Sequence, residues 1–534
     1  MGIPAYLRHV VTKHRSILKK LCDADVKVDN LYLDSNSDVY DALRDLINDG
    51  VSSNDKNFEA KLIKATCKRI EGHIIGIKPR ICVMVAFDGT APVAKLDQQR
   101  QRRIKTAFEK RLKEEIGISA SGAEWSSAAI TPGTAFMESL ANEATKYFKA
   151  KRFPFVKKII VSTSKEEGEG EHKIFEKIRS ETRHMNETTV VKGLDADLIM
   201  LTLNHLRFAK ELYLTRETPH FIRSIDKSLE PNETYLLDMP AMGAALTEEL
   251  NDGNDIHDES QKQRMFDYIL ICFFLGNDFL PHFPTLNIRT TGIDRMLSAY
   301  KVTLSKSKGN LTSNEGIVWK NVRTFVSVLA ENERDNFIAE DSVRAKQSKY
   351  AGNPRDGEDP LDARFQSLPL IDMRREESIR PSERGWEDRY YMQAFGEVLS
   401  EERKREVCIN YIEGIEWTFK YYSSGCPDWR WTYRYAYPPL FSDLAKYVPY
   451  LDVELIPQKP ANPVSSNVQL AYVLPPDQLH LLPEPIHKAL LAGHSEWYKQ
   501  PSEFLWLYCR YFWESHPIMP DINLEMLELC VEST

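Results

Sequence analysis

The stretch Ile-Cys-Val-Met-Val-Ala-Phe-Asp at residues 81–88 carries the pattern that decides the fold: an apolar run of strand length that ends in a carboxylate. A very polar helical pattern follows it, from Lys95 to Glu115. The same alternation predicts strands at 28–33, 156–162 and 188–192, and helices at 58–77, 170–180 and after Asp195. Such β-then-α alternation favours an α/β fold with a mainly parallel central sheet flanked by helices.

The composition is that of a folded protein with no membrane span. The chain has 534 residues, of which 42% are hydrophobic. The most apolar stretch, Tyr268 to Leu280, is shorter than the roughly 18 to 20 residues that a span needs, so it predicts a buried helix. The eight cysteines are scattered without a Cys-x-x-Cys pair and no secretory segment opens the sequence. We therefore expect a reducing compartment, the cytoplasm first, with the nucleus or a viral particle left open.

Charge and composition change along the chain. The net charge is −8, so any nucleic-acid binding must come from a local basic patch. Residues 305–395 contain charge runs and Pro/Gly breaks, which predict a charged linker that is partly disordered. On this basis we divide the chain into a core over 1–304, the linker over 305–395, and an aromatic-rich helical region over 396–534 packed on the core.

Carboxylates follow the ends of the predicted strands and of the buried helix. In an open parallel sheet the carboxyl ends of the strands meet at one edge, where ligands bind. Seven carboxylates could converge there: Asp34, Asp88, Glu169, Glu171, Asp195, Asp197 and Asp278. Because so many carboxylates repel one another, we expect two divalent ions, Mg²⁺ or Mn²⁺, to be bound among them. Two such ions suit hydrolysis of a phosphodiester.

Each carboxylate also has a simpler explanation when taken alone. An Asp or Glu at a strand end or a helix start commonly caps orphan N–H groups. His172 is interpreted as a supporting or core residue. Glu169/Glu171 and Asp195/Asp197 are i, i+2 pairs, which diverge within a helix, so one member of each pair is expected to bind metal directly. The repetition across successive βα units is what favours a metal site over capping.

At these segments the sequence resembles the XRN family of 5′→3′ exoribonucleases. The resemblance spans nearly the whole chain except 305–395. The stretches that carry it are Asp29 to Asp34, Phe87-Asp88-Gly89, Gly168-Glu169-Gly170-Glu171-His172-Lys173-Ile174, Gly193-Leu194-Asp195-Ala196-Asp197, Gly276-Asn277-Asp278-Phe279-Leu280-Pro281-His282, Tyr421-Tyr422 through Trp429 and Trp431 to Ser442-Asp443-Leu444, Val473-Leu474-Pro475-Pro476 and Leu482-Pro483-Glu484-Pro485.

The resemblance implies a fold and an activity. The core would be of the PIN and flap-nuclease type, and all seven carboxylates would be catalytic and metal-binding. The activity implied is processive degradation of single-stranded RNA with a 5′-monophosphate to mononucleotides. The match covers a catalytic region alone, a minimal form such as a viral member would have, and we expect a monomer.

The resemblance also implies a pocket for the 5′-phosphate at Lys95, Gln99, Arg102 and Arg103. These residues follow i, i+4, i+7, i+8 spacing, so they share one helix face. Arginine forks suit phosphate binding, although a solvated basic face is the simpler interpretation of the segment alone.

Two aromatic positions are expected to stack on bases. Tyr40 stands where the family has a histidine, and Trp429 is preferred over Trp431, which is predicted to be core. Glu167 replaces the family's proline before the Gly-Glu-Gly-Glu stretch. Two other functions stay open: a flap-type DNA nuclease, disfavoured by Phe-Leu-Pro-His-Phe-Pro after Asp278, and a nuclease-dead RNA-binding scaffold.

Overall fold

The protein is described by a computed structural model, which covers residues 13–21, 26–115, 125–195, 197–215, 230, 233–253, 259–305, 309–355, 357–501 and 503–534. These residues form a seven-stranded sheet in the order β1-β7-β6-β5-β2-β3-β4. The five neighbouring strands from β6 to β4 are parallel, while β7 and β1 add an antiparallel edge. The strands are β1 Leu18–Lys20, β2 Asn30–Asp34, β3 Cys82–Ala86, β4 Lys158–Ser162, β5 Thr188–Lys192, β6 Glu211–Thr215 and β7 Tyr235–Asp238.

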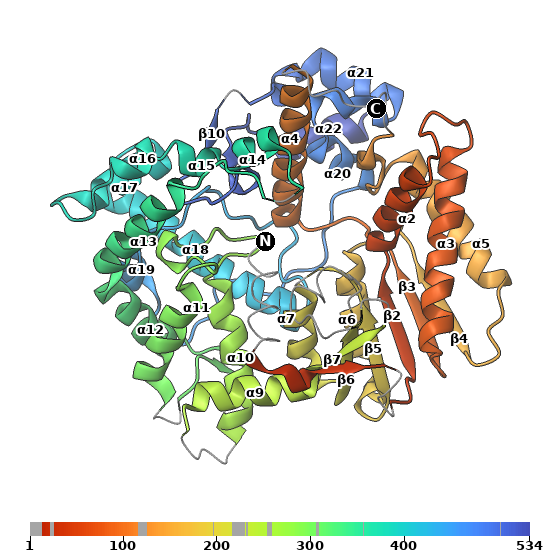
Figure 1. Ribbon diagram of the computed structural model, residues 1–534, viewed down its shortest axis with the longest axis horizontal. Coiled ribbons are helices and arrows are strands. Elements are labelled where there is room, and N and C mark those ends of the chain that lie inside the picture. Colours follow the sequence, from red (N-terminus) through yellow and green to blue (C-terminus); the bar gives the residue numbers. More distant parts are fainter. Residues whose placement is uncertain are drawn as a thin grey trace.

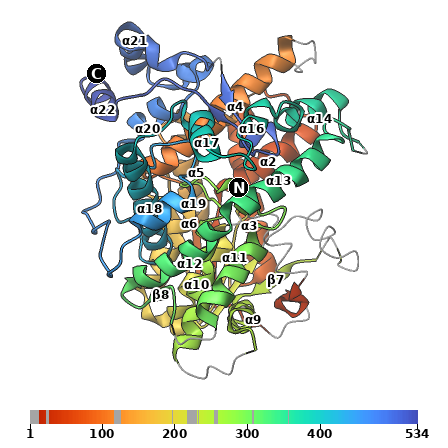
Figure 2. The same ribbon diagram turned by 90° about the vertical axis from the view of Figure 1, so that its left-hand side faces the viewer.

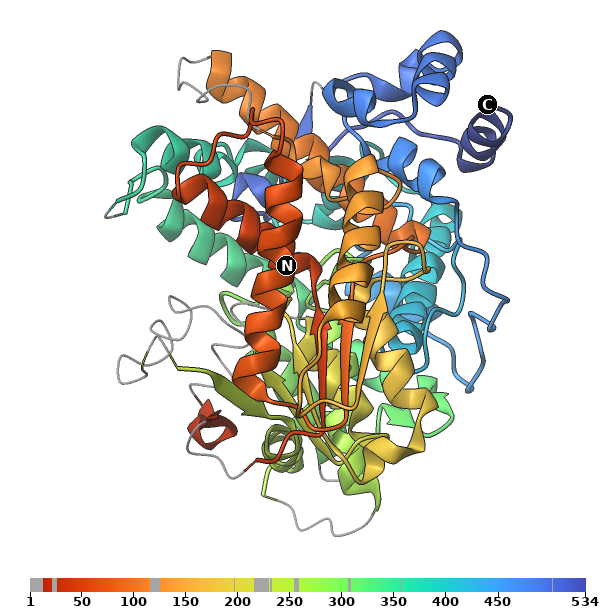
Figure 3. The same cartoon turned by 90° about the vertical axis from the view of Figure 1, so that its right-hand side faces the viewer.

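Helices cover both faces of this sheet, as Figure 1 shows. Alternate residues of β2 and β3 point to opposite faces, so Leu31 and Val83 pack in one apolar cluster while Tyr32 and Met84 pack in another. The first cluster includes α2 (Asn36–Asn48), α3 (Phe58–Ile77) and α5 (Ala135–Ala150). In Figure 3 the red-orange α3 and the orange α5 stand in front of the strands. The second includes α6 (Gly170–Ser180), α7 (Asp197–Asn204), α9 (Met239–Asn251) and α10 (Glu259–Phe273). The predicted α/β class is confirmed.

The expectation of a partly disordered linker over 305–395 is wrong for the described residues of that stretch. They form α12 Trp319–Glu331, α13 Glu333–Ser348, α14 Pro360–Gln366, α15 Leu368–Ile371, α16 Arg374–Glu377 and α17 Trp386–Phe395. Figure 2 shows α12 and α13 beside α11, α17 and α19. Phe337, Trp386 and Tyr390 belong to one buried cluster. The charge runs indicated disorder, but in the structure their charges lie on outer helix faces or are paired. An example is the buried Arg344–Glu376 salt bridge, at 2.6 and 2.7 Å.

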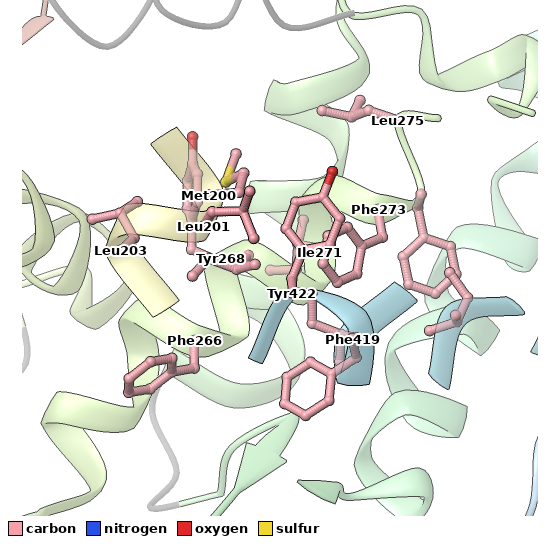
Figure 4. Packing of buried hydrophobic residues seen from close by; sticks show 14 of the residues in the cluster. Met200, Leu201, Leu203, Phe266, Tyr268, Ile271, Phe273, Leu275, Phe419 and Tyr422 are labelled. Carbon is pink, nitrogen blue, oxygen red and sulfur yellow. The ribbon is translucent and has the colours of Figure 1, made fainter. Parts of the chain in front are cut away.

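Further helices complete a second region, which packs on helices of the first region. They are α11 Gly292–Tyr300, α18 Glu401–Ser423, α19 Phe441–Tyr447, α20 Ser466–Val473, α21 Glu484–Gly493 and α22 Leu524–Glu532. The short strands β8 Thr312–Ser313 and β9 Gly316–Ile317 form a hairpin, and β10 Phe504–Leu505 pairs with β11 His516–Pro517. The end of α18 lies against α7 and α10, where Figure 4 shows Tyr422 beside Phe273. No helix in the described ranges combines the length and apolarity needed to cross a bilayer.

The long polar helix α4 (Val93–Glu115) joins the two regions. Its first turn follows β3, and it packs on α20 of the second region. The buried cations Arg100 and Lys105 donate to backbone carbonyls of residues 497–520. This anchoring fixes the helix face that carries the predicted phosphate residues next to the sheet edge.

Candidate active site

The candidate site lies where the order of the parallel strands reverses. From β2 the chain adds β3 and β4 on one side, then returns to place β5 and β6 on the other side of β2. A ligand crevice is expected outside the carboxyl ends of the strands at such a switch point. Asp34 ends β2, and Asp195 follows β5 across this gap. The topology therefore positions Asp34 and Asp195 directly.

Glu169 and Glu171 reach the same place from the start of α6. The amide of Gly170 donates to Asp88 Oδ1 at 2.7 Å, which ties the helix start to the residue after β3. Asn36 Nδ2 holds the other Asp88 oxygen at 2.6 Å. Glu169 is the N-cap residue of α6, yet its side chain makes no capping bond. The capping interpretation therefore does not hold for Glu169.

Asp278 arrives from a separate element. The buried helix predicted over 268–280 is found as α10, which ends at Phe273, and Gly276 then turns the chain with a φ of +83°. A Cβ at Gly276 would lie 2.7 Å from the backbone nitrogen of His282, so the turn needs glycine. Lys95 Nζ bonds Asp278 Oδ2 at 2.8 Å and Glu169 Oε1 at 2.7 Å. Lys95 thus links Asp278 to the cluster.

Two groupings of side chains have the spacing of a metal site. Asp34, Glu171 and Asp195 each offer an oxygen within 4.8 Å of the others, and Glu169, Glu171 and His172 form a second such group. Glu171 Oε2 is buried without a hydrogen-bond partner. An oxygen-rich set with an unsatisfied carboxylate oxygen fits Mg²⁺ or Mn²⁺. His172 also packs against Tyr421, with ring centroids 3.7 Å apart and the planes tilted by 34°, which agrees with a supporting role.

Burial and mutual repulsion disturb the protonation of these groups. Burial, followed by the charge of Asp88, holds the pKa of Asp34 well above its usual range, and burial with Glu169 does the same to the pKa of Glu171. Burial and Glu169 raise the pKa of Asp88 to about 6. Burial acts to raise the pKa of Asp278, but nearby positive charges, chiefly the ammonium of Lys95 and also Arg102, together lower it to about 2. Lys95 compensates only part of the negative charge of the carboxylate cluster, so bound cations would stabilise its ionised form.

Two buried tyrosines from the second region complete the site. Tyr421 donates to Glu169 Oε2 at 2.7 Å, and its neighbour Tyr422 donates to Asp197 Oδ2 at 2.8 Å. Both lie on α18, and Figure 4 shows Tyr422 among core residues. The sequence alone assigns them no role, because a tyrosine on a buried helix stripe resembles core until its hydroxyl partner is seen.

A single cavity of about 520 Å³ joins the acidic cluster to the basic helix face. It is lined by Asp34, Asp88, Glu169, Glu171 and Asp195, and by Tyr40, Lys95, Gln99, Arg102 and Arg103. Arg103 Nη2 donates to Thr131, while Arg103 Nη1 and Gln99 Oε1 are buried without a partner. Burial lowers the pKa of Arg103 to about 10. The four predicted phosphate residues therefore face the cavity, three of them free of carboxylate partners among the described residues.

The two predicted tryptophans differ from each other. Trp431 is buried and stacks on Trp417 at 5.3 Å, as expected for core. Trp429 is half-buried, and its carbonyl accepts from the amide of Val93 at the start of α4. It does not line the cavity, whereas Tyr40 does and is 41% exposed. Stacking by Trp429 stays a prediction.

Comparison with known proteins gives two family matches. A model described as XRN 5′-3′ exonuclease N-terminus matches residues 1–218, and one described as Xrn1 helical domain matches 260–367 and 369–506. The chain is 28% identical to 5′-3′ exoribonuclease 2 homolog of Drosophila melanogaster over 610 residues, covering 92% of this chain and 66% of that protein.

Two further relatives give the same picture. Identity is 28% to 5′-3′ exoribonuclease 1 of Saccharomyces cerevisiae, covering 90% of this chain and 40% of that protein. It is 26% to 5′-3′ exoribonuclease 2 of Gallus gallus, covering 100% of this chain and 70% of that protein. The chain thus spans about two thirds of the fly protein and two fifths of the yeast protein.

Proposed function

This chain belongs to the XRN family of 5′→3′ exonucleases, and we propose that it is a metal-dependent exoribonuclease that removes nucleotides singly from the 5′ end of RNA bearing a 5′-monophosphate. One observation carries the proposal. The same cavity of about 520 Å³ is lined by five of the seven predicted carboxylates and by Lys95, Gln99, Arg102 and Arg103. A substrate with a terminal phosphate and a nearby phosphodiester matches both sets of residues.

The carboxylates would bind the metal ions. Asp34, Glu171 and Asp195 have the spacing to hold one Mg²⁺ or Mn²⁺, and Glu169 lies within reach of a second through its contact with Glu171. Two such ions would stabilise the attacking and leaving oxygens of a phosphodiester. Tyr421 and Lys95 fix the two oxygens of Glu169, so this side chain is held in one orientation before any ligand binds.

The basic helix face would select the end of the RNA. Gln99, Arg102 and Arg103 sit on consecutive turns of α4 and line the cavity beside Asp88. Arg103 is half-buried and its free Nη1 donor has no protein partner. A 5′-monophosphate would satisfy these donors, whereas a 5′-hydroxyl would leave their charges uncompensated. Tyr40 lines the same cavity and offers an exposed ring for stacking on a base.

The competing functions fit the geometry less well. A nuclease-dead scaffold would not need seven carboxylates, of which five face one cavity. A flap-type DNA nuclease would grip duplex DNA with a glycine-rich motif after the last aspartate, where this chain has Phe279 to Pro284. The cytoplasmic location and the monomeric state stay predictions.

The experiment compares initial rates on one RNA with four 5′ ends: monophosphate, hydroxyl, triphosphate and cap. We expect the monophosphate to be degraded fastest in Mg²⁺, and the triphosphate and cap to be refused on steric grounds. In Arg102→Ala/Arg103→Ala the ratio of monophosphate to hydroxyl rates should fall at least about tenfold, since a charge-assisted hydrogen bond contributes about 1.5 to 3 kcal/mol. Arg111→Ala, on the same helix outside the cavity, should leave the ratio unchanged. An unchanged ratio in the double variant would mean that this face only guides the RNA backbone.

A further inference from the structure

A second cleft, of about 640 Å³, lies at the far end of α6 from the carboxylates. Glu169 and Glu171 are at the start of this helix of 11 residues, whereas Arg179 lies in its last turn, about 12 to 15 Å along the axis. The other walls come from Arg207 and Phe208, the β8–β9 hairpin, and Ser423 and Ser424 at the end of α18 (β8 is labelled in Figure 2). The cleft has the size of a small-ligand site and is separate from the active-site cavity.

Arg179 lines this cleft without an ion-pair partner among the described residues, and the charge of Glu176, three residues earlier in α6, acts on it only from beyond that distance. Its Nη1 is 2.9 Å from His205 Nε2. His205 Nδ1 is 2.6 Å from the carbonyl of Leu201, which only accepts, so Nδ1 carries the proton and Nε2 is the acceptor. Burial and then Arg179 hold the pKa of His205 at about 3, so the imidazole is neutral. Among the described residues no carboxylate lies within ion-pair distance of Arg179.

Arg207, like Arg179, lines the cleft and lacks an ion-pair partner among the described residues. Its guanidinium lies over the ring of Phe266 at 4.1 Å, and its Nε is buried without a hydrogen-bond partner. Within the described ranges it forms no salt bridge. Burial lowers the pKa of both arginines from their usual value, which reports the cost of burying an uncompensated cation. Two such groups in one cleft indicate an anionic ligand.

Three of the four carboxylates that line the cleft form hydrogen bonds or ion pairs with other protein groups. Glu416 accepts from the amides of Leu455 and Ile456, and Asp452 accepts from the amide of Trp319. Lys420 is paired with both Glu416 and Glu454. Glu315 is exposed on the hairpin and lies beyond ion-pair distance of either arginine. These carboxylates keep their charge, so the lining as a whole is not positive, and an anion would bind only at the end of the cleft where Arg179 and Arg207 lie.

We propose that this cleft is a binding site for a phosphate ester the size of a nucleoside monophosphate, held by Arg179 and Arg207. Guanidinium groups bind phosphate oxygens with paired, charge-assisted hydrogen bonds. The hydroxyls of Ser423 and Ser424 donate to carbonyls of α18, so their oxygens can accept from the sugar hydroxyls of the ligand, and the ring of Phe208 can supply an apolar contact. A free mononucleotide and a phosphate of an RNA chain share this chemistry. The proposal is independent of the nuclease function.

The test is calorimetric titration of the full chain in chelator, so that no RNA is cleaved. The probes are AMP, inorganic phosphate and a 5′-phosphorylated pentanucleotide, and the background is Arg102→Ala/Arg103→Ala, which disables the phosphate face of the active site. We expect AMP or the pentanucleotide to bind with a stoichiometry of one in this background, the tighter of the two identifying the source. Adding Arg179→Gln and Arg207→Gln should weaken that binding at least tenfold, whereas the exposed control Arg405→Gln should not change it.

A measurement on the unmodified chain guards against misfolding of the variants. Phenylglyoxal modifies accessible arginines, and AMP should protect Arg179 and Arg207 from it while leaving Arg405 reactive, as read by mass spectrometry. The proposal is overturned if none of the three probes binds in the Arg102→Ala/Arg103→Ala background. It is equally overturned if binding persists unchanged in Arg179→Gln/Arg207→Gln, or if AMP binds without protecting either arginine.

Discussion

Gly170→Ala tests the description of the acidic cluster with a single methyl group. Gly170 is the first residue of α6, and its amide holds Asp88 Oδ1. A Cβ added there would lie 2.7 Å from Asp34 Oδ1, 3.1 Å from the carbonyl of Ala86 and 3.4 Å from Asp88 Oδ1. The new methyl group therefore points at two carboxylates of the site, and no charge or hydrogen bond is removed.

The size of the effect follows from these distances. Ordinary contact begins at 3.4 Å, so Asp34 Oδ1 must retreat by about 0.7 Å. Metal ligands have to be held within about 0.5 Å of their productive position, and a shift of about 1 Å at a reacting centre can cost about 100-fold in rate. Because alanine favours a helix over glycine by about 0.5 to 1 kcal/mol, part of the strain is offset in the stability of the fold. We expect kcat to fall about 30- to 100-fold, with the melting temperature nearly unchanged.

The assay is kcat on 5′-monophosphorylated RNA in Mg²⁺, with thermal unfolding measured on the same samples. Gly72→Ala is the matched control: it is the same substitution in α3, where nothing lies within 4 Å of the added Cβ. This control should keep full activity. Wild-type kcat in a folded Gly170→Ala protein would refute the reasoning, because Asp34 would then not be needed where the structure places it.

Three further predictions concern metal binding. Asp278→Ala should abolish cleavage while the circular dichroism spectrum stays native; residual activity above about one hundredth of wild type would argue against its role. Tyr421→Phe and Tyr422→Phe should each weaken Mn²⁺ binding about 10- to 100-fold in a direct titration, because each hydroxyl orients a carboxylate; unchanged binding would make them packing residues. Burial, with a neighbouring carboxylate, raises the pKa of Asp88 and of Asp197 to about 6 in the metal-free protein, above the unfolded value. Their contribution to stability is therefore lost as pH rises through 6, so Mn²⁺ should raise the melting temperature more at pH 7.5 than at pH 5, and equal gains would contradict this assignment.

Periodic features of the core could be predicted from the sequence. The helix over 58–77 and the strand over 188–192 are found with the predicted bounds, because apolar spacing and flanking polar residues agree there. The convergence of Asp34, Asp88 and Asp195 followed from parallel strands sharing one edge. β6 and β7 were not predicted, because their apolar runs are too short for their sequence pattern alone to indicate a strand.

Features that depend on distant partners could not be predicted. The helices of 319–395 have charged outer faces, and only the buried positions of residues such as Trp386 and Tyr390 show that the segment folds. The ion pairs of Lys95 with Glu169 and Asp278 join residues that are 74 and 183 positions apart. Local pattern placed Lys95 on the phosphate face, whereas tertiary structure turns its ammonium toward the acidic cluster.

The central claim is that the acidic cluster, with metal, cleaves RNA from its 5′ end. The most direct test is a time course on a 5′-monophosphorylated RNA carrying one label on its 5′-terminal nucleotide or one at its 3′ end, in Mg²⁺ and in chelator. We predict that the 5′ label appears as a mononucleotide from the first time point, that the 3′ label stays in full-length RNA until late, and that chelator stops both. Internal fragments, early release of the 3′ label, or equal cleavage in chelator would contradict the claim.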